Sequence, residues 1–226
     1  MNDRKAAAAQ AALQEVSSGM VLGLGTGSTV QFFLEALAER IASGDVRDVV
    51  GVPTSRATER ESRRLGIPLV DLPAEGVDVA VDGMDEVDPS LNAVKGLGGA
   101  LLREKVVAES AKRFVLIGDD GKPVDRLGAK TPLPIEVLAF GIARTEARIR
   151  ALGLEPSLRG GVLEPFLSDN GHPILDAALP EVEDLPGLAR SLDAIPGVLG
   201  HGLFLGMADV AYLATGDGVK RVERAG

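Results

Sequence analysis

Short apolar runs alternate with longer amphipathic stretches through the first half of the chain. The apolar runs predict strands at residues 21–24, 49–52, 69–70, 77–81 and 114–117. Stretches with apolar residues at helical spacing predict helices at residues 30–41, 55–65 and 100–112. Strands that alternate with helices indicate an α/β fold, with a mainly parallel sheet and helices on both faces (Rossmann-like). Ligands bind beyond the carboxyl ends of such strands, so we expect the chemistry in the loops that follow them.

The pattern changes near Gly128. We expect strands at residues 135–138, on both sides of the turn 168–171 and at 203–205, and helices at 142–152 and 186–193. This β-α-β-β-α-β order predicts a small α+β ferredoxin-like satellite layer at residues 129–203, acting as a lid and in oligomerisation. Residues 1–128 and 204–226 then form the main α/β catalytic domain, because the apolar run after residue 210 is expected to return to the main sheet.

Composition supports this fold class and narrows the partners. Apolar residues make up 45% of the chain but aromatic residues only 3%, which suits parallel strands covered by Ala- and Leu-rich helices. The net charge of −9 weighs against nucleic acid or a membrane as the main partner. No apolar run approaches the roughly 18 residues of a membrane span, and the first residues do not resemble a signal peptide. The absence of cysteine excludes thiolate chemistry and disulfides. From the lack of a recognisable signal peptide and membrane span we expect a cytoplasmic protein.

A glycine-rich segment, GLGTGST at residues 23–29, lies between a predicted strand and a predicted helix. Glycines allow backbone N–H groups to approach a ligand, and a helix N-terminus favours an anion, so the segment predicts a phosphate site. A P-loop would need Lys where Ser28 stands, and a dinucleotide site would need an acid where the second strand ends in VPTS (residues 52–55). The alternative is a tight turn with Ser or Thr as the helix N-cap.

Two carboxylates, Asp82 and Asp85, follow the strand predicted at residues 77–81. Three residues apart at the end of a strand, they could contact the hydroxyls of a polyol or bind a metal ion. An EF-hand is excluded because its further ligands are missing. The alternative is an acidic surface turn with an Asx bend.

A second glycine-rich segment, VKGLGGALLREK at residues 94–105, also precedes a predicted helix. Glu104 shares a face of that helix with Ala100 and Ala108, so its carboxylate is expected to point toward the core. A carboxylate in this position suits a general base. The alternative is a first-turn glutamate that faces solvent and interacts only with the helix dipole.

Three other side chains carry weaker signals. Lys122 follows a predicted strand through a turn and could reach the same crevice, although a lone lysine in a turn is more typical of a solvated surface residue. His172 and His201 are the two histidines of the chain, and we assign a role to neither.

Together these segments resemble the type A ribose-5-phosphate isomerases, in the order and spacing of that family over about residues 5–220. The departures from the family pattern are Met84 and Leu97, in place of the usual Ala and Gly, the sequence Asp120-Gly121 before Lys122, where a Ser is more usual, and His172 in place of Asn. Met84 and Leu97 could narrow the substrate pocket. The matching stretches are residues 23–29, 52–55, 82–86, 95–105, 134–137, 169–171, 196–198 and 202–204.

The resemblance implies reversible isomerisation of D-ribose 5-phosphate to D-ribulose 5-phosphate through an enediolate, in the non-oxidative pentose phosphate pathway. It implies that Glu104 moves the proton between C2 and C1 and that Lys95 stabilises the enediolate. Asp82 and Asp85 would contact sugar hydroxyls and assist ring opening. No cofactor is expected and, with Lys95 as electrophile, no metal. The partners are a sugar phosphate and a second copy of the chain, as a homodimer or possibly a tetramer. The remaining implied substrate contacts are Lys5, Thr26, Gly27, Ser28, Thr29, Gly96, Gly98, Gly99 and Lys122.

Three other functions stay open at this level. One is a related isomerase for an amino-sugar phosphate. A second is a sugar-phosphate sensor of a transcription regulator, which would need a basic DNA-binding module for which the chain has neither length nor charge. A third is a coenzyme A transferase with a glutamate nucleophile. The Asp82/Asp85 pair and Lys95 argue against that third function.

Overall fold

The structure is a computed structural model that describes residues 2–224, and these residues form two compact units. Unit 1 comprises residues 2–84, 103–122 and 206–224, and unit 2 comprises residues 85–102 and 123–205. Within the described residues, no helix is both long and apolar enough to cross a membrane.

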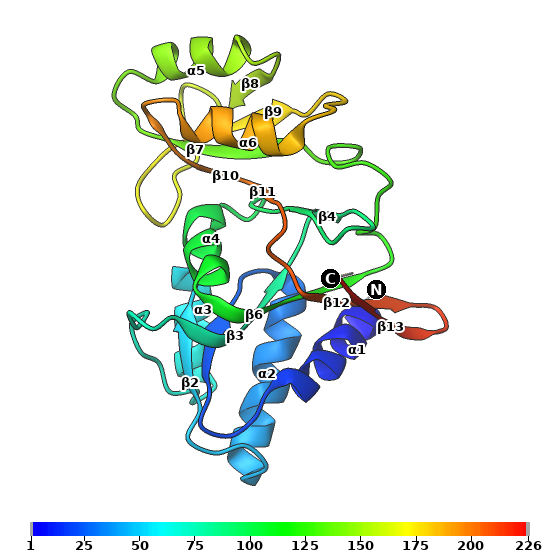
Figure 1. Ribbon diagram of the computed structural model, residues 1–226. Coiled ribbons are helices and arrows are strands. Elements are labelled where there is room, and N and C mark those ends of the chain that lie inside the picture. Colours follow the sequence, from blue (N-terminus) through cyan, green and yellow to red (C-terminus); the bar gives the residue numbers. More distant parts are fainter. Residues whose placement is uncertain (1, 225–226) are drawn as a thin grey trace. The chain divides into compact units, whose positions relative to one another are not determined.

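Unit 1 is built on a six-stranded sheet with the strand order β13-β12-β6-β3-β1-β2 (Figure 1). All neighbouring strands in it are parallel except the hairpin pair β12–β13. The α/β class with a mainly parallel sheet is therefore confirmed. The strands are β1 (Val21–Leu24), β2 (Val50–Pro53), β3 (Val77–Gly83), β6 (Ala111–Asp119), β12 (Val210–Thr215) and β13 (Gly218–Glu223).

Helices cover both faces of this sheet. α1 (Asn2–Ala12) and α2 (Ser28–Ser43) lie side by side (Figure 1), and their buried residues share one core with Leu22 and Leu24 of β1. Side chains alternate along a strand, so Gly23 faces the other side. A Cβ on Gly23 would lie 2.5 Å from Val107 of α4 (Leu101–Glu109), which packs there. α3 (Arg56–Arg64) follows β2 and is capped by the Ser55 side chain.

Unit 1 differs from the sequence prediction at its edges. We did not predict α1, because its core residues are small alanines whose hydrophobic signal is weak, although Ala8, Ala9 and Ala12 are fully buried. We also missed β13, an edge strand rich in charged residues. The strand predicted at residues 69–70 is only an isolated bridge between Gly51 and Leu69. α4 ends at Glu109, before the predicted end, because β6 begins at Ala111.

A polar network joins the sheet of unit 1 to the short 3-10 helix η1 (Leu13–Glu15). Tyr212, which is 1% exposed, donates a 2.5 Å hydrogen bond to one oxygen of Glu15, and Arg113 donates a 2.8 Å bond to the other. Burial opposes ionisation of Glu15, but the hydrogen bonds from Tyr212 and Arg113 outweigh it and lower the pKa of the carboxyl. Burial and the bond to Glu15 raise the pKa of Tyr212.

Unit 2 contains a four-stranded antiparallel sheet with the order β10-β7-β9-β8. Its elements follow the chain as β-α-β-β-α-β, so the predicted ferredoxin-like α+β layer is confirmed. They are β7 (Leu133–Val137), α5 (Ile142–Arg150), β8 (Glu155–Leu158), β9 (Ile174–Ala178), α6 (Leu185–Asp193) and β10 (Val198–His201).

Two strands of unit 2 lie elsewhere than predicted. The strand before β9 is β8, well before the turn at residues 168–171, and only Leu167 bridges across that turn, to Pro173. The fourth strand is β10, which is interrupted by a bulge and carries Gly and His, so its apolar signal is weak. The apolar run predicted as that strand is β11 (Leu203–Phe204), which pairs with β5 (Ala93–Val94) in a separate sheet whose third strand is β4 (Glu86–Val87). The satellite boundaries at residues 129 and 203 and the lid role stay predictions.

Candidate active site

The first glycine-rich segment of unit 1 connects β1 to α2, as predicted. The Thr26 N–H donates a 3.0 Å hydrogen bond to Oδ1 of Asp82. Gly25 leaves no room for a side chain, because a Cβ there would lie 2.2 Å from the Asp82 carboxyl group. Gly27 has a φ of +118°, a conformation that favours glycine, and α2 begins at the next residue, Ser28. The segment therefore brings a carboxylate against a loop that opens onto a helix N-terminus.

The N-terminus of α2 carries a cation and a hydroxyl. Lys5 of α1 donates a 2.8 Å hydrogen bond through Nζ to Oγ of Ser28. The N-cap residue Gly27 has no side chain with which to cap the helix. Ser28 is exposed, whereas Thr29 is buried at 6% exposure. An ammonium, a hydroxyl and a helix N-terminus together favour an anion.

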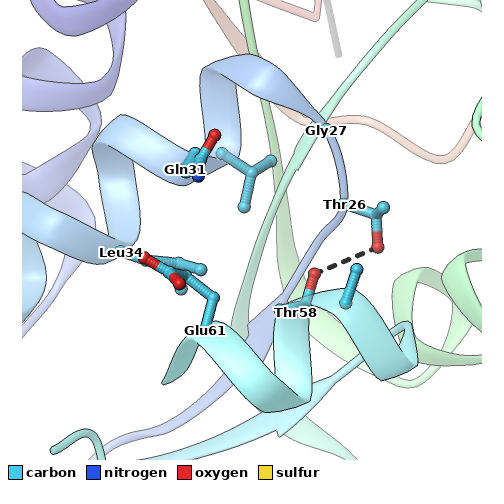
Figure 2. A pocket seen from close by; sticks show the side chains of 8 residues that line it. Thr26, Gly27, Gln31, Leu34, Thr58 and Glu61 are labelled. Carbon is cyan, nitrogen blue, oxygen red and sulfur yellow. Dashed lines mark hydrogen bonds between the residues drawn. The ribbon is translucent and has the colours of Figure 1, made fainter. Parts of the chain in front are cut away.

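A cluster of threonine hydroxyls holds the loop between β1 and α2 in place. Oγ1 of Thr26 lies 2.9 Å from Oγ1 of Thr54 and 3.2 Å from Oγ1 of Thr58, the contact drawn in Figure 2. Thr58 in turn donates a 2.7 Å bond to the carbonyl of Gly25 and is bonded through its own N–H to the N-cap Ser55. Thr58 was not among the predicted site residues. Its only signal in the sequence is a hydroxyl residue three positions after a Ser N-cap.

A pocket of about 230 Å³ lies beside this cluster, between α2 and α3 (Figure 2). The surface that its wall presents is mostly apolar, and the wall includes the side chain of Glu61, whose pKa is lowered by a hydrogen bond from Arg64. A phosphate group is therefore suited less well to this pocket than to the N-terminus of α2. The lining residues are Thr26, Gly27, Val30, Gln31, Leu34, Ala57, Thr58 and Glu61.

Asp82 lies at the end of β3 and is only 3% exposed. Its Oδ1 accepts hydrogen bonds from the N–H of Thr26, described above, and from the N–H of Gly83 at 2.7 Å. Backbone N–H groups stabilise a carboxylate and fix its orientation. The arrangement excludes the alternative of a solvated acidic turn at Asp82.

Glu104 lies in the first turn of α4 and is 5% exposed. Val107 and Ala108 of the same helix are also buried, and Val107 packs on the sheet. The prediction that Glu104 lies on a core-directed face is therefore confirmed, and the solvent-facing alternative is wrong.

In unit 2 the structure brings Asp85 and Lys95 to the second glycine-rich segment. Oδ2 of Asp85 accepts a 3.0 Å hydrogen bond from the N–H of Leu97. Lys95 is 2% exposed, and its Nζ lies 5.4 Å from the centroid of the Phe204 ring. An ammonium over an aromatic ring is stabilised as a cation. Both groups are charged side chains that the fold fixes beside one loop.

The glycines of that loop differ in whether the structure requires glycine at their positions. Gly96 has a φ of +107° and Gly99 a φ of +82°, both in the region that favours glycine. A Cβ on Gly99 would also lie 2.5 Å from the Phe166 ring. Gly98 has no such restriction, since a Cβ there would meet nothing within 4 Å.

Lys122 follows β6 through the expected turn, and its side chain is half-buried. The preceding Asp120 forms a 2.6 Å ion pair with Arg4 of α1, so the turn is attached to the helix that carries Lys5. The role of Lys122 in the substrate site stays a prediction.

The two departures that could narrow the substrate pocket, Met84 and Leu97, lie in different surroundings. Met84 is 5% exposed, and its Sδ would lie 2.7 Å from a Cβ on Gly118 of β6, so it packs closely on the sheet of unit 1. Leu97 is 41% exposed. Met84 therefore occupies space inside its unit, whereas Leu97 lies at the surface of unit 2.

Other polar residues of unit 2 have local partners. Nδ1 of His201 accepts a hydrogen bond from the Leu203 N–H, and Nε2 lies 3.2 Å from the Asp193 carboxylate. The buried Glu86 accepts three backbone N–H bonds of 2.5–2.6 Å from the segment 128–131. These groups stabilise loops, and sequence reasoning had assigned neither a function. Among residues 2–224 no cluster of three or more His, Asp or Glu side chains has metal-binding geometry.

Comparison with known proteins gives one consistent result. The family model for ribose 5-phosphate isomerase A (phosphoriboisomerase A) matches residues 50–218. Ribose-5-phosphate isomerase A of Roseiflexus sp. (strain RS-1) is 51% identical over 216 residues, which cover 94% of this chain and 92% of that protein. The protein of the same name from Bradyrhizobium diazoefficiens is 47% identical and covers 99% and 97% of the two chains.

Solved structures agree with the sequence comparisons. A D-ribose-5-phosphate isomerase in complex with phospho-erythronic acid superposes with a TM-score of 0.94 at 40% identity, over 98% of both chains. Ribose 5-phosphate isomerase of Plasmodium falciparum superposes with a TM-score of 0.94 at 38% identity, over 100% of both chains.

Proposed function

The chain belongs to the ribose 5-phosphate isomerase A family, and from that premise we propose how its residues interconvert D-ribose 5-phosphate and D-ribulose 5-phosphate. The observation that carries the function is the 51% identity to an isomerase of this name over 94% of the chain. The test is to incubate the protein with ribose 5-phosphate and excess chelator and to follow formation of the ketose. Ketose must form at a protein-dependent rate, and its absence would refute the function.

The reaction moves two protons, one between carbons and one between oxygens, and leaves the overall oxidation state unchanged. A base removes the C2 proton of the open-chain aldose, which gives an enediolate, and the same proton is then delivered to C1. A proton also passes from the C2 oxygen to the C1 oxygen. One carboxylate can act first as base and then as acid, because the two carbons are adjacent. The charge that develops on oxygen needs donors or a cation placed in advance.

We assign the proton transfer between the carbons to Glu104. Its burial in the first turn of α4 supports this role, because electrostatic interactions between a carboxylate and the reacting atoms are stronger where bulk water is excluded. Asp82 is assigned to the sugar hydroxyls and to ring opening. Its orientation is set by two backbone N–H groups, which is what a positioning contact to a hydroxyl requires.

We assign stabilisation of the enediolate to Lys95 and to the N–H groups of Gly96 and Gly98 in the loop that follows it. Gly99 is assigned to shaping this loop, because its N–H donates to the Gly96 carbonyl at 2.9 Å. The support is the fixed ammonium over Phe204 and the glycine conformations of the loop. Asp85, bonded to this loop, is assigned to a sugar hydroxyl. A cation and N–H donors supply the electrophile, so we propose that neither a metal nor another cofactor takes part.

The phosphate is assigned to the N-terminus of α2, with Lys5, Ser28, Thr29 and Gly27 around it. The 2.8 Å contact between Lys5 and Ser28 supports this choice, because it places a cation and a hydroxyl at the positive end of a helix dipole. Thr26 and Lys122 are assigned to the lining of the substrate site.

We further propose that the protein is cytoplasmic, acts in the non-oxidative pentose phosphate pathway, and forms a homodimer or tetramer through its satellite layer. The support for self-association is exposed apolar surface on unit 2: Phe140 and Val162 are each 87% exposed, and Leu163 is fully exposed. Sedimentation at micromolar concentration tests the oligomer, and a monomer there would contradict it.

A further inference from the structure

The loop at residues 96–99 is attached to unit 2 on two sides. On one side Asp85 accepts the 3.0 Å hydrogen bond from the Leu97 N–H. On the other side Nη1 of Arg159 donates to the carbonyl of Leu97 at 2.9 Å and to the carbonyl of Gly96 at 3.3 Å. Arg159 lies 62 residues further along the chain, directly after β8. Sequence reasoning did not identify it.

The guanidinium of Arg159 is itself fixed by Asp176 of β9. Nε and Nη2 donate to the two oxygens of Asp176 at 2.7 and 2.5 Å, and the two side chains are only 14% and 21% exposed. The guanidinium is planar, so this two-point pair sets the direction in which Nη1 points. The Arg159 backbone is attached to β9 as well, through its N–H and the carbonyl of Ile174 at 2.9 Å.

Phe166 adds a packing contact to the hydrogen bonds. Its ring centroid lies 5.4 Å from the Arg159 guanidinium, and its N–H donates to the Arg159 carbonyl at 2.9 Å. The same ring occupies the position that a side chain on Gly99 would need. Arg159 and Phe166 thus contact the loop at Leu97 and at Gly99.

Because a peptide unit is rigid, these contacts also fix the direction of a backbone donor, the Gly98 N–H. The carbonyl of one residue and the N–H of the next belong to one rigid plane and point in opposite directions. The bond from Arg159 to the Leu97 carbonyl therefore directs the Gly98 N–H away from Arg159. The preceding plane is fixed at both ends, by Arg159 at the Gly96 carbonyl and by Asp85 at the Leu97 N–H.

We propose that Arg159 is a positioning residue for the isomerisation, which aims the Gly98 N–H of the loop at the charge that develops on the enediolate. The inference rests on the proposed function, because that function assigns the loop to the enediolate. Arg159 acts through the loop. Preorganised donors stabilise the transition state more than the bound substrate, so the loss of Arg159 lowers kcat more than it weakens phosphate binding.

Arg159→Met tests this role, because methionine keeps an unbranched apolar stem and removes every side-chain donor. The matched control is Arg150→Met, which removes an ion pair with Glu146 on α5 of the same unit. We measure kcat and KM for ribose 5-phosphate, the Kd of phospho-erythronic acid, the Kd of inorganic phosphate, and Tm. Phospho-erythronic acid is informative because its carboxylate carries negative charge as the enediolate does.

For Arg159→Met we expect kcat to fall at least about 10-fold, within the range that misplaced catalytic groups produce. The Kd of phospho-erythronic acid rises in parallel and the Kd of phosphate stays near the wild-type value. Arg150→Met keeps the wild-type kcat. Two further variants keep the test decisive if Arg159→Met does not fold. Arg159→Lys keeps a positive charge beside Asp176 but loses the planar guanidinium that binds both carboxylate oxygens. Asp176→Asn keeps Arg159 but removes the charged two-point partner that orients it. Both variants should therefore lower kcat.

The measurements distinguish a failure of the positioning role of Arg159 from a failure of the proposed isomerase function. An inactive wild type overturns the proposed function. An active wild type whose folded Arg159 and Asp176 variants keep full kcat overturns the positioning role alone. A lower Tm with unchanged kcat also overturns it, because Arg159 would then only stabilise the fold. Loss of phosphate affinity in proportion to kcat overturns it too, since the damage would then be general.

Discussion

Replacing Glu104 by glutamine tests the assignment on which the mechanism depends most. Glutamine keeps the size and shape of the side chain at a site that is 5% exposed, so no cavity forms, but it cannot accept the C2 proton. Loss of a general base lowers kcat by ~10²–10⁴-fold, which corresponds to about 2.7–5.5 kcal/mol of activation free energy. The charge of a first-turn glutamate interacts with the helix dipole by only about 0.3–1 kcal/mol. The activity loss should therefore far exceed any loss of stability.

The assay combines turnover, proton exchange and melting. We expect kcat for ketose formation to fall within this range, and exchange of the substrate C2 proton with deuterated solvent to slow equally. Substrate affinity and Tm should change little. Glu109→Gln is the matched control, because Glu109 is an exposed glutamate at the end of the same helix. It should leave kcat and proton exchange at wild-type values.

One result would refute the reasoning. If Glu104→Gln kept more than about a tenth of the wild-type kcat, the loss would be smaller than a general base accounts for. The base would then have to be sought elsewhere, with Asp82 as the next candidate. Lower stability with nearly intact turnover would indicate that Glu104 is a structural residue of α4.

Three further predictions follow from the geometry. Removing the hydroxyls of Ser28 and Thr29 should raise KM strongly, since hydrogen bonds to a charged group are worth roughly 1.5–3 kcal/mol each; equal binding of free ribose and ribose 5-phosphate by the wild type would contradict this. Gly99→Ala forces a methyl group into an aromatic ring at positive φ and should lower both kcat and Tm, whereas Gly98→Ala meets no atom within 4 Å and should keep its Tm. The pKa of Glu15 is lowered in the folded state, so its ionised carboxylate stabilises the fold above pH 4.5, and this contribution is lost as the pH falls. Glu15→Gln should therefore reduce the free energy of unfolding above pH 4.5 and make it depend less on pH in the acid range. Urea titrations that give the same acid dependence for the variant and the wild type would argue against this.

Features that depend on residues close together in the sequence could be predicted from the sequence. Apolar runs and helical spacing located β1, α2, β3 and α6 closely, because these elements bury one face or both against a core. Glu104 could be placed on a buried face for the same reason. The glycine-rich segments were recognisable because tight turns and close backbone approach need glycine locally. Elements with weak apolar signals were missed, such as the alanine helix α1 and the charged edge strand β13.

The groups that fix the loops could not be predicted, because they come from distant parts of the chain. Thr58 reaches the Gly25 carbonyl only because β1 and β2 pair side by side and α3 starts where β2 ends. Arg159 reaches the Leu97 carbonyl only because β8 pairs with β9 in the register that brings Asp176 beside it. Neither residue has a local pattern that distinguishes it from a surface threonine or arginine. A hydrogen bond depends on direction within tens of degrees and on distance within tenths of an ångström, so only the packed tertiary structure decides it.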